Sequence, residues 1–110
     1  MSTVADYLPY MQAWLDARAA QTQPIADYNS AKTAMQNARQ AVGARVAAGD
    51  TAVQMTALVQ TYATNRATYL TADAAMRNAL DKTATTAATS EAMMELLCTG
   101  QTIPPYVPGG

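Results

Sequence analysis

The feature that most constrains this chain is a short interruption, Ala-Ala-Gly-Asp-Thr at residues 47–51, between two long alanine-rich stretches. Gly49 can adopt the left-handed backbone conformation that ends a helix. Thr51 followed by Gln54 has the pattern of a capping box, in which two side chains satisfy free amides at a helix start. No proline occurs between Pro24 and Pro104, so each stretch can form several helical turns. The sequence therefore predicts an antiparallel helical hairpin.

Helical spacing of apolar residues extends this prediction to an all-α fold. In the N-terminal segment the apolar residues recur at steps of three and four, at positions 4, 8, 11, 15 and 19. Tyr7 and Trp14 widen this stripe, and Trp14 is expected to anchor the core, with a partner-binding hot spot as the alternative. After the turn a similar stripe contains Met55, Val59, Tyr62, Tyr69, Met76 and Leu80. We expect one helical domain over residues 1–100, with helices at about 3–21, 24–48, 51–82 and 90–98. The first helix would dock on the hairpin as in a three-helix bundle, and residues 101–110 would form an extended proline-rich arm.

Two places leave the helix boundaries open. Residues 83–90 are rich in threonine, whose β-branched side chain weakens a helix, so we expect a break there with Ser90 as the cap of a short last helix. One continuous helix of about 48 residues is the alternative, because no Gly or Pro separates Thr51 from Thr99. Pro9 is compatible with the first helix if Asp6 is its N-cap.

The large apolar residues are few for a chain of this length. Half of the 110 residues count as hydrophobic, but 25 are alanine and only 15 are leucine, isoleucine or valine. Alanine buries little area, so the core is thin and the isolated chain is expected to be weakly stable or self-associated. Burial against other protein subunits, of its own kind or of other kinds, would compensate.

The charge pattern argues against several partners. The formal net charge is −1, and the seven basic residues are spread from Arg18 to Lys82, so no nucleic-acid contact is predicted. No run of eighteen apolar residues exists, so no membrane span is predicted. The N-terminus lacks the basic and apolar blocks of a secretory signal. We expect synthesis in the cytoplasm without a classical signal peptide, with a virion as one destination.

The side chains that carry most catalytic chemistry are missing. There is no histidine, and Cys98 is the one cysteine, so we predict no catalytic residue, cofactor or metal site. Glu91 and Glu95 share a helical face, where two acids usually face water. The ladder Asp73, Arg77 and Asp81 indicates local ion pairs on a solvated face or a polar register key at a helix contact. The chain is therefore not expected to be an enzyme.

The C-terminal arm is too apolar for an inert linker. Its prolines favour an extended conformation, and its apolar side chains would bind a neighbouring subunit. The predicted partner-binding residues, on the arm and on the helix before it, are Met93, Met94, Leu97, Ile103, Pro104, Pro105, Tyr106 and Val107. We interpret the chain as a non-enzymatic structural or assembly subunit, with a bacteriophage capsid or tail as one setting. The alternatives are a soluble adaptor or chaperone-like module that presents a methionine-rich helix, and a secreted helical-hairpin effector.

Overall fold

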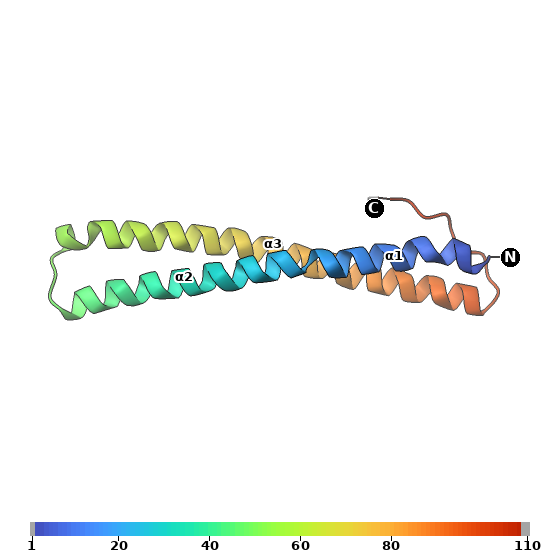
Figure 1. The fold of residues 1–110 in the computed structure, drawn as a ribbon, viewed down its shortest axis with the longest axis horizontal. Helices are drawn as coiled ribbons and strands as arrows, with labels where there is room; N and C mark the ends of the chain where they lie inside the picture. Colours follow the sequence, from blue (N-terminus) through green and yellow to red (C-terminus); the bar gives the residue numbers. More distant parts are fainter. Residues whose placement is uncertain (1, 109–110) are drawn as a thin grey trace. The chain divides into compact units, whose positions relative to one another are not determined.

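The computed structural model describes residues 2–108, and these residues form three helices and no strand (Figure 1). Helix α1 spans Val4–Ala20, α2 spans Thr22–Ala47 and α3 spans Ala52–Cys98. The all-α fold and the helical hairpin are confirmed. The predicted arm from residue 101 is described as far as Pro108, and its last two residues lie outside the described part.

The chain divides into two compact units. Unit 1 contains α1, the part of α3 from Asn78 onward and the C-terminal arm, whereas unit 2 is residues 23–77. Each unit pairs two helical segments, so docking of a third helix onto the hairpin is not confirmed. In unit 1, Tyr7 contacts Ser90 and Ala17 contacts Thr83, so α1 and the end of α3 are antiparallel.

The turn that joins α2 to α3 is built as the sequence predicted. Gly49 has a φ of 83°, and its amide donates to the carbonyl of Val46 while the amide of Asp50 donates to Arg45. This bond pair is the Schellman motif, which satisfies the last free carbonyls of a helix. On the other side, the Thr51 amide donates to Gln54 Oε1 at 2.8 Å and the Gln54 amide to Thr51 Oγ1 at 3.3 Å. The capping box is therefore confirmed.

The break expected at residues 83–90 is wrong, and so is the short helix from 90 to 98. Helix α3 runs through this stretch without interruption. The hydroxyls of Thr83 and Thr86 donate to the carbonyls of Ala79 and Lys82, which lie one turn earlier in the same helix. Threonine in this conformation satisfies its hydroxyl inside the helix and need not disrupt it. Gly100, with a φ of 73°, then ends α3 in a second Schellman motif.

The start of α1 differs from the prediction in its capping residue. Thr3 is the N-cap, and its amide donates to the carboxylate of Asp6 at 2.8 Å. Pro9 is then the sixth residue of the helix and lies beyond the first turn. The carbonyl of Ala5 consequently has no amide partner within the helix, and because Ala5 is exposed, water can satisfy it.

Helices α1 and α2 are separated by Gln21 alone. This residue has nearly helical angles, φ −79° and ψ −14°, so the interval between the predicted helices 3–21 and 24–48 is reduced to one residue. Pro24 is the third residue of α2, where an amide has no partner to lose. Its predicted position early in the second helix is thus confirmed.

Most of the covered side chains of α3 follow steps of three and four over its whole length, and Asp73, Ala87 and Leu96 are half-buried beside this repeat. The residues in the repeat are Met55, Leu58, Tyr62, Asn65, Tyr69, Ala72, Met76, Ala79, Thr83, Thr86, Ser90, Met93 and Leu97. Such a repeat is the a and d pattern of a coiled-coil seam. Val59 and Leu80, which belong to the predicted stripe, are instead exposed.

The same spacing continues through α1 and α2. The covered residues in this repeat are Tyr7, Tyr10, Trp14, Ala17, Gln21, Pro24, Tyr28, Ala31, Met35, Ala38 and Val42, and Pro9, Met11, Ala13 and Ile25 are half-buried beside it. The stripe predicted for α1 is therefore wrong at Val4, Leu8 and Leu15, which are exposed. Tyr7, at the edge of the predicted stripe, is buried, and Met11 and Trp14 are half-buried. Tyr7 and Tyr10 fit in the seam because their hydroxyls have hydrogen-bond partners, and an assignment of the buried face by hydropathy alone passes over them.

Candidate partner-binding surface

The C-terminal arm folds back onto its own chain at Ile103. This side chain is 5% exposed and forms a core cluster with Tyr7 and Tyr10. The Ile103 amide donates to Ser2 Oγ at 2.6 Å, so the start of the arm contacts the residues before α1. The apolar area of Ile103 is consequently buried within unit 1 and is not offered to a partner.

Tyr10 holds the next part of the arm through both its hydroxyl and its ring. The hydroxyl donates to the Pro104 carbonyl at 2.5 Å, and the ring meets Tyr106 edge to face with centroids 5.2 Å apart. Beneath the arm lies a groove of about 290 Å³, lined by Tyr10, Ala13, Thr85, Thr86, Thr89, Pro105, Tyr106 and Val107. Small side chains dominate its floor, so the arm covers it without filling it.

The predicted partner-binding residues separate into two groups. Ile103 is buried, and Met93 and Leu97 are half-buried against the cluster of Tyr7, Tyr10 and Ile103. The exposed group consists of Met94, Pro104, Pro105, Tyr106 and Val107. Val107 is the most open of the apolar members, with 72% of its surface exposed. Only the second group remains available as a binding surface.

Polar contacts inside the seam of unit 1 are absent from the sequence-based prediction. The hydroxyls of Tyr7 and Ser90 lie 3.0 Å apart, and Ser90 is 4% exposed. Thr83 Oγ1 lies 2.9 Å from Gln21 Oε1 and 3.2 Å from the Ala17 carbonyl. Among the described residues, no buried side-chain nitrogen or oxygen lacks a hydrogen-bond partner. One sequence signal could have indicated these contacts. Ser90 follows Thr83 by seven residues, so both lie on the seam side of α3.

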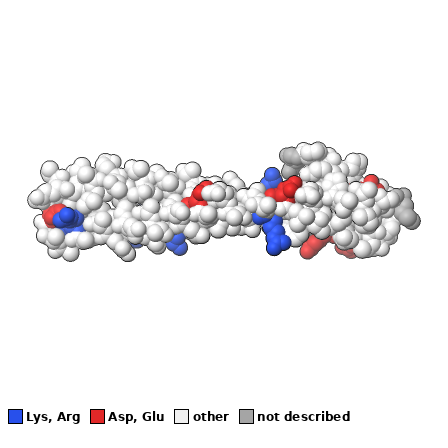
Figure 2. All heavy atoms as spheres, viewed as in Figure 1, with Lys and Arg blue, Asp and Glu red and all other residues white. Residues whose placement is uncertain are grey.

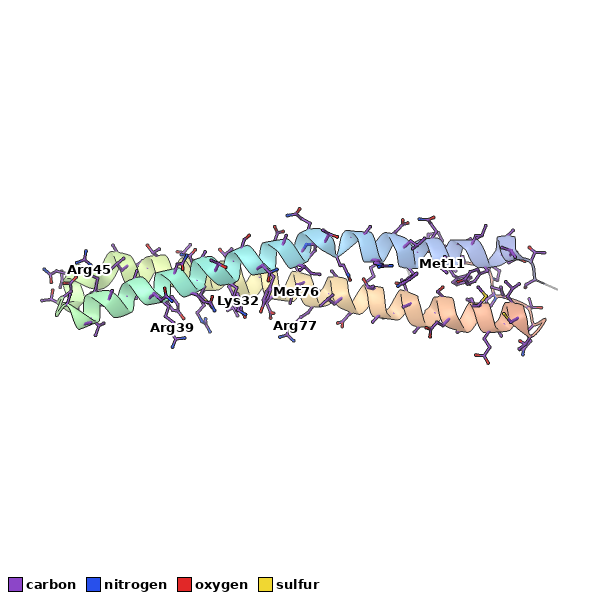
Figure 3. The ribbon with its side chains drawn as sticks, turned by 60° about the horizontal axis from the view of Figure 1, so that its bottom comes forward. Met11, Lys32, Arg39, Arg45, Met76 and Arg77 are labelled. Atoms are coloured by element: carbon purple, nitrogen blue, oxygen red, sulfur yellow. The ribbon has the colours of Figure 1, made fainter. Side chains whose placement is uncertain are left out.

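A row of exposed apolar side chains lies outside the seam of unit 1. We define this outer apolar face by the residues Val4, Leu8, Leu15, Leu80 and Met94. With the seam positions named a and d, these residues occupy the neighbouring b and e positions. In an antiparallel pair the e positions of both helices lie on one side of the seam. Figure 3 shows Met11, another e residue, between the ribbons of α1 and α3.

The arm lies on the opposite side of unit 1 from this face. Ala13 and Thr89, which line the groove beneath the arm, occupy g positions on α1 and α3. The g positions of an antiparallel pair lie across the seam from the e positions. One side of the unit 1 seam is thus covered by the arm, and the other side exposes apolar surface.

Trp14, expected to anchor the core, is only half-buried. The guanidinium carbon of Arg18 lies 5.7 Å from the centroid of its ring, within the range of a cation–π contact. The tryptophan therefore occupies the edge of the seam, with one face toward a charged side chain.

Unit 2 has a seam of small residues with a tyrosine pair. The Tyr28 and Tyr69 hydroxyls lie 3.5 Å apart, and this hydrogen bond is the largest cause of the raised pKa of Tyr69. A shallow groove of about 740 Å³ runs beside the pair and is lined mainly by alanine, serine and threonine. Asp73 accepts from Arg77 Nε at 3.0 Å, which raises the pKa of Arg77 and supports the local ion-pair interpretation. Asp81 joins no ion pair among residues 2–108.

Within the described residues, no group of three or more His, Cys, Asp or Glu side chains is arranged to hold a metal ion. Cys98 is exposed at the end of α3. No helix in the described part of the chain is long and apolar enough to span a membrane. Comparison of the chain with protein-family models, curated proteins and solved structures found no match.

Proposed function

We propose that this chain is a non-enzymatic structural or assembly protein that works as a subunit of a larger oligomeric complex. The observation that carries the proposal is the outer apolar face of unit 1, which coexists with a thin core. Four of the nine buried residues are alanines, and no described side chain is less than 2% exposed. Covering Leu8, Leu15 and Leu80 in an assembly would add apolar burial that the isolated chain lacks.

The charge distribution supports protein partners in the same proposal. Only 14% of the residues are charged, and on the face drawn in Figure 2 uncharged atoms cover most of the surface. Association between proteins depletes charged residues at the centre of the contact and tolerates them at the rim. A virus particle, especially a bacteriophage capsid or tail, is the setting that we propose to examine first, because such particles use many copies of small subunits.

The adaptor or chaperone-like alternative receives less support. That hypothesis requires the end of α3 to present methionines to clients as an adaptable surface. Met93 packs against the core cluster with Leu96 and Leu97, and Met94 alone of the two methionines points outward. No described contact favours the secreted effector over these two classes.

The experiment that tests the proposed function is purification of the chain from its native source under mild conditions. An assembly subunit should be recovered in a particle of high molecular mass with a fixed ratio to the other components. Recovery as a free chain whose partners vary and exchange reversibly would favour the adaptor class. Recovery as a free chain without partners would contradict both hypotheses.

A further inference from the structure

The two units carry opposite net charge. Unit 1 contains five acidic and two basic side chains, a formal charge of −3, whereas unit 2 contains three acidic and five basic side chains, a charge of +2. The chain as a whole is nearly neutral, at −1. Association driven by the units would therefore favour unlike units of different copies over like units.

Unit 1 has exposed acidic side chains that could contact another copy of the chain. Asp81, Glu91 and Glu95 on the end of α3 form no ion pair among residues 2–108. Glu91 occupies a b position of α3, between the e positions of Ala87 and Met94, and so borders the outer apolar face. Asp81 and Glu95 occupy f positions, next to the b positions on the outside of α3, and Arg18 is the one basic residue at an e position of unit 1.

Unit 2 has exposed basic side chains of the opposite charge. Lys32, Arg39 and Arg66 are exposed and join no ion pair among the described residues, whereas the other two basic residues of the unit pair with Asp50 and Asp73. All three of these cations occupy e positions, beside the seam of the unit. Lys32 also lies over the ring of Tyr28, with its Nζ 6.0 Å from the ring centroid. Figure 3 shows Lys32 and Arg39 projecting along one edge of unit 2 together with Arg77.

Apolar side chains accompany these cations. Ile25 and Val46 share the e positions of α2 with Lys32 and Arg39, and Val59 shares those of α3 with Arg66. Val46 and Val59 are exposed, and Ile25 is half-buried. The e side of unit 2 is therefore a mainly apolar and basic surface, on which Asp73 is paired with Arg77. The e side of unit 1 is apolar apart from Arg18 and has Glu91 beside it.

We propose that the outer apolar face of unit 1 binds the e side of unit 2 in a second copy of this chain. Leu8, Leu15 and Leu80 meet apolar side chains of the second copy. Asp81, Glu91 and Glu95 pair with its Lys32, Arg39 and Arg66. The proposal deepens the proposed function, on which it rests, by naming a second copy as the partner.

Sedimentation equilibrium of three chains tests this docking. One is the wild type. An acid-reversed variant carries Asp81→Lys, Glu91→Lys and Glu95→Lys, and a base-reversed variant carries Lys32→Glu, Arg39→Glu and Arg66→Glu. All six positions are exposed, so helix content by circular dichroism should match the wild type. Each variant alone should self-associate about tenfold more weakly or worse, because like charges then oppose each other across the contact.

An equimolar mixture of the two variants provides the decisive comparison. Opposite charges again face each other in the mixed pair, so the mixture should associate at least about tenfold more tightly than either variant alone. A mixture no tighter than its components overturns the proposal. The double variant Leu8→Gln, Leu15→Gln should also weaken wild-type association, whereas Val53→Gln, at a side chain that is 85% exposed in unit 2, should not.

The result separates this docking from the broader function. Wild-type self-association that neither charge reversal nor the leucine changes alter would overturn the docking and leave the assembly function in place. A chain that stays monomeric in solution but copurifies in a particle of fixed composition would do the same. A monomer that also copurifies with nothing would remove both proposals.

Discussion

Tyr10 is a single side chain that holds the C-terminal arm against α1. Its hydroxyl donates to the Pro104 carbonyl at 2.5 Å, and its ring is buried beside Ile103. The Tyr10→Phe substitution keeps the ring and deletes the donor, so we expect the free energy of unfolding to fall by about 0.5–1.5 kcal/mol. Urea denaturation followed by circular dichroism measures this change.

The matched control for Tyr10→Phe is Tyr62→Phe. Tyr62 is half-buried in unit 2, and its hydroxyl has no hydrogen-bond partner among residues 2–108. This change should alter stability by less than about 0.5 kcal/mol. Equal effects of the two substitutions would show that the contact to Pro104 contributes nothing.

Tyr69 gives unit 2 a pH dependence at high pH. Its hydrogen bond with Tyr28 raises the pKa of Tyr69 above the ordinary value of 10.0, with burial and Asp73 as further causes. A raised folded-state pKa means that the stabilisation is fully present below the unfolded-state pKa and is lost as the pH rises through the folded-state pKa. Unfolding measured from about pH 9 upward should thus show a smaller alkaline decline in Tyr69→Phe than in the wild type. An equally steep decline would assign the dependence to other groups.

At the scale of the element, two glycines of the hairpin should respond to alanine with opposite signs. Gly49 has a φ of 83°, which an alanine adopts only with strain, so Gly49→Ala should destabilise the chain by about 1–2 kcal/mol. Gly43 lies inside α2, and an alanine Cβ at this position would meet no neighbouring atom within 4 Å. Gly43→Ala should therefore stabilise the chain by about 0.8–1 kcal/mol. Thermal unfolding of both variants checks the pair, and destabilisation at Gly43 would indicate a close contact there.

The ends of the hairpin helices could be predicted from the sequence, whereas the side of each helix that is buried could not. Gly49 and Thr51 act through bonds within a few residues, so the turn could be derived from the sequence alone. Thr83 and Ser90 also meet polar partners from α1, and those partners are distant in the sequence. The face of α1 was misassigned for a related reason, since Tyr7 is buried against Ile103 and its hydroxyl contacts Ser90, and both residues are distant in the sequence.

At the scale of the whole molecule, composition predicted the character of the arm but not its target. Three prolines and three apolar side chains indicate an extended segment that buries area. Whether that area is buried in the same chain depends on where Gly100 turns the backbone relative to α1. Ile103 is buried in the same chain and its amide donates to Ser2. Val107, further along the arm, is exposed.

The arm should therefore stabilise unit 1 of the isolated chain as well as any assembly. Ile103→Ala removes buried aliphatic volume from the Tyr7 and Tyr10 cluster, so we expect a loss of about 2–5 kcal/mol in the free energy of unfolding. Val107→Ala, at an exposed position of the same arm, should cost less than about 0.5 kcal/mol. Deletion of residues 101–110 should cost at least as much as Ile103→Ala, and amide hydrogen exchange should rise first in α1. If Ile103→Ala and Val107→Ala are equally mild in the monomer, the arm does not pack on its own chain in solution.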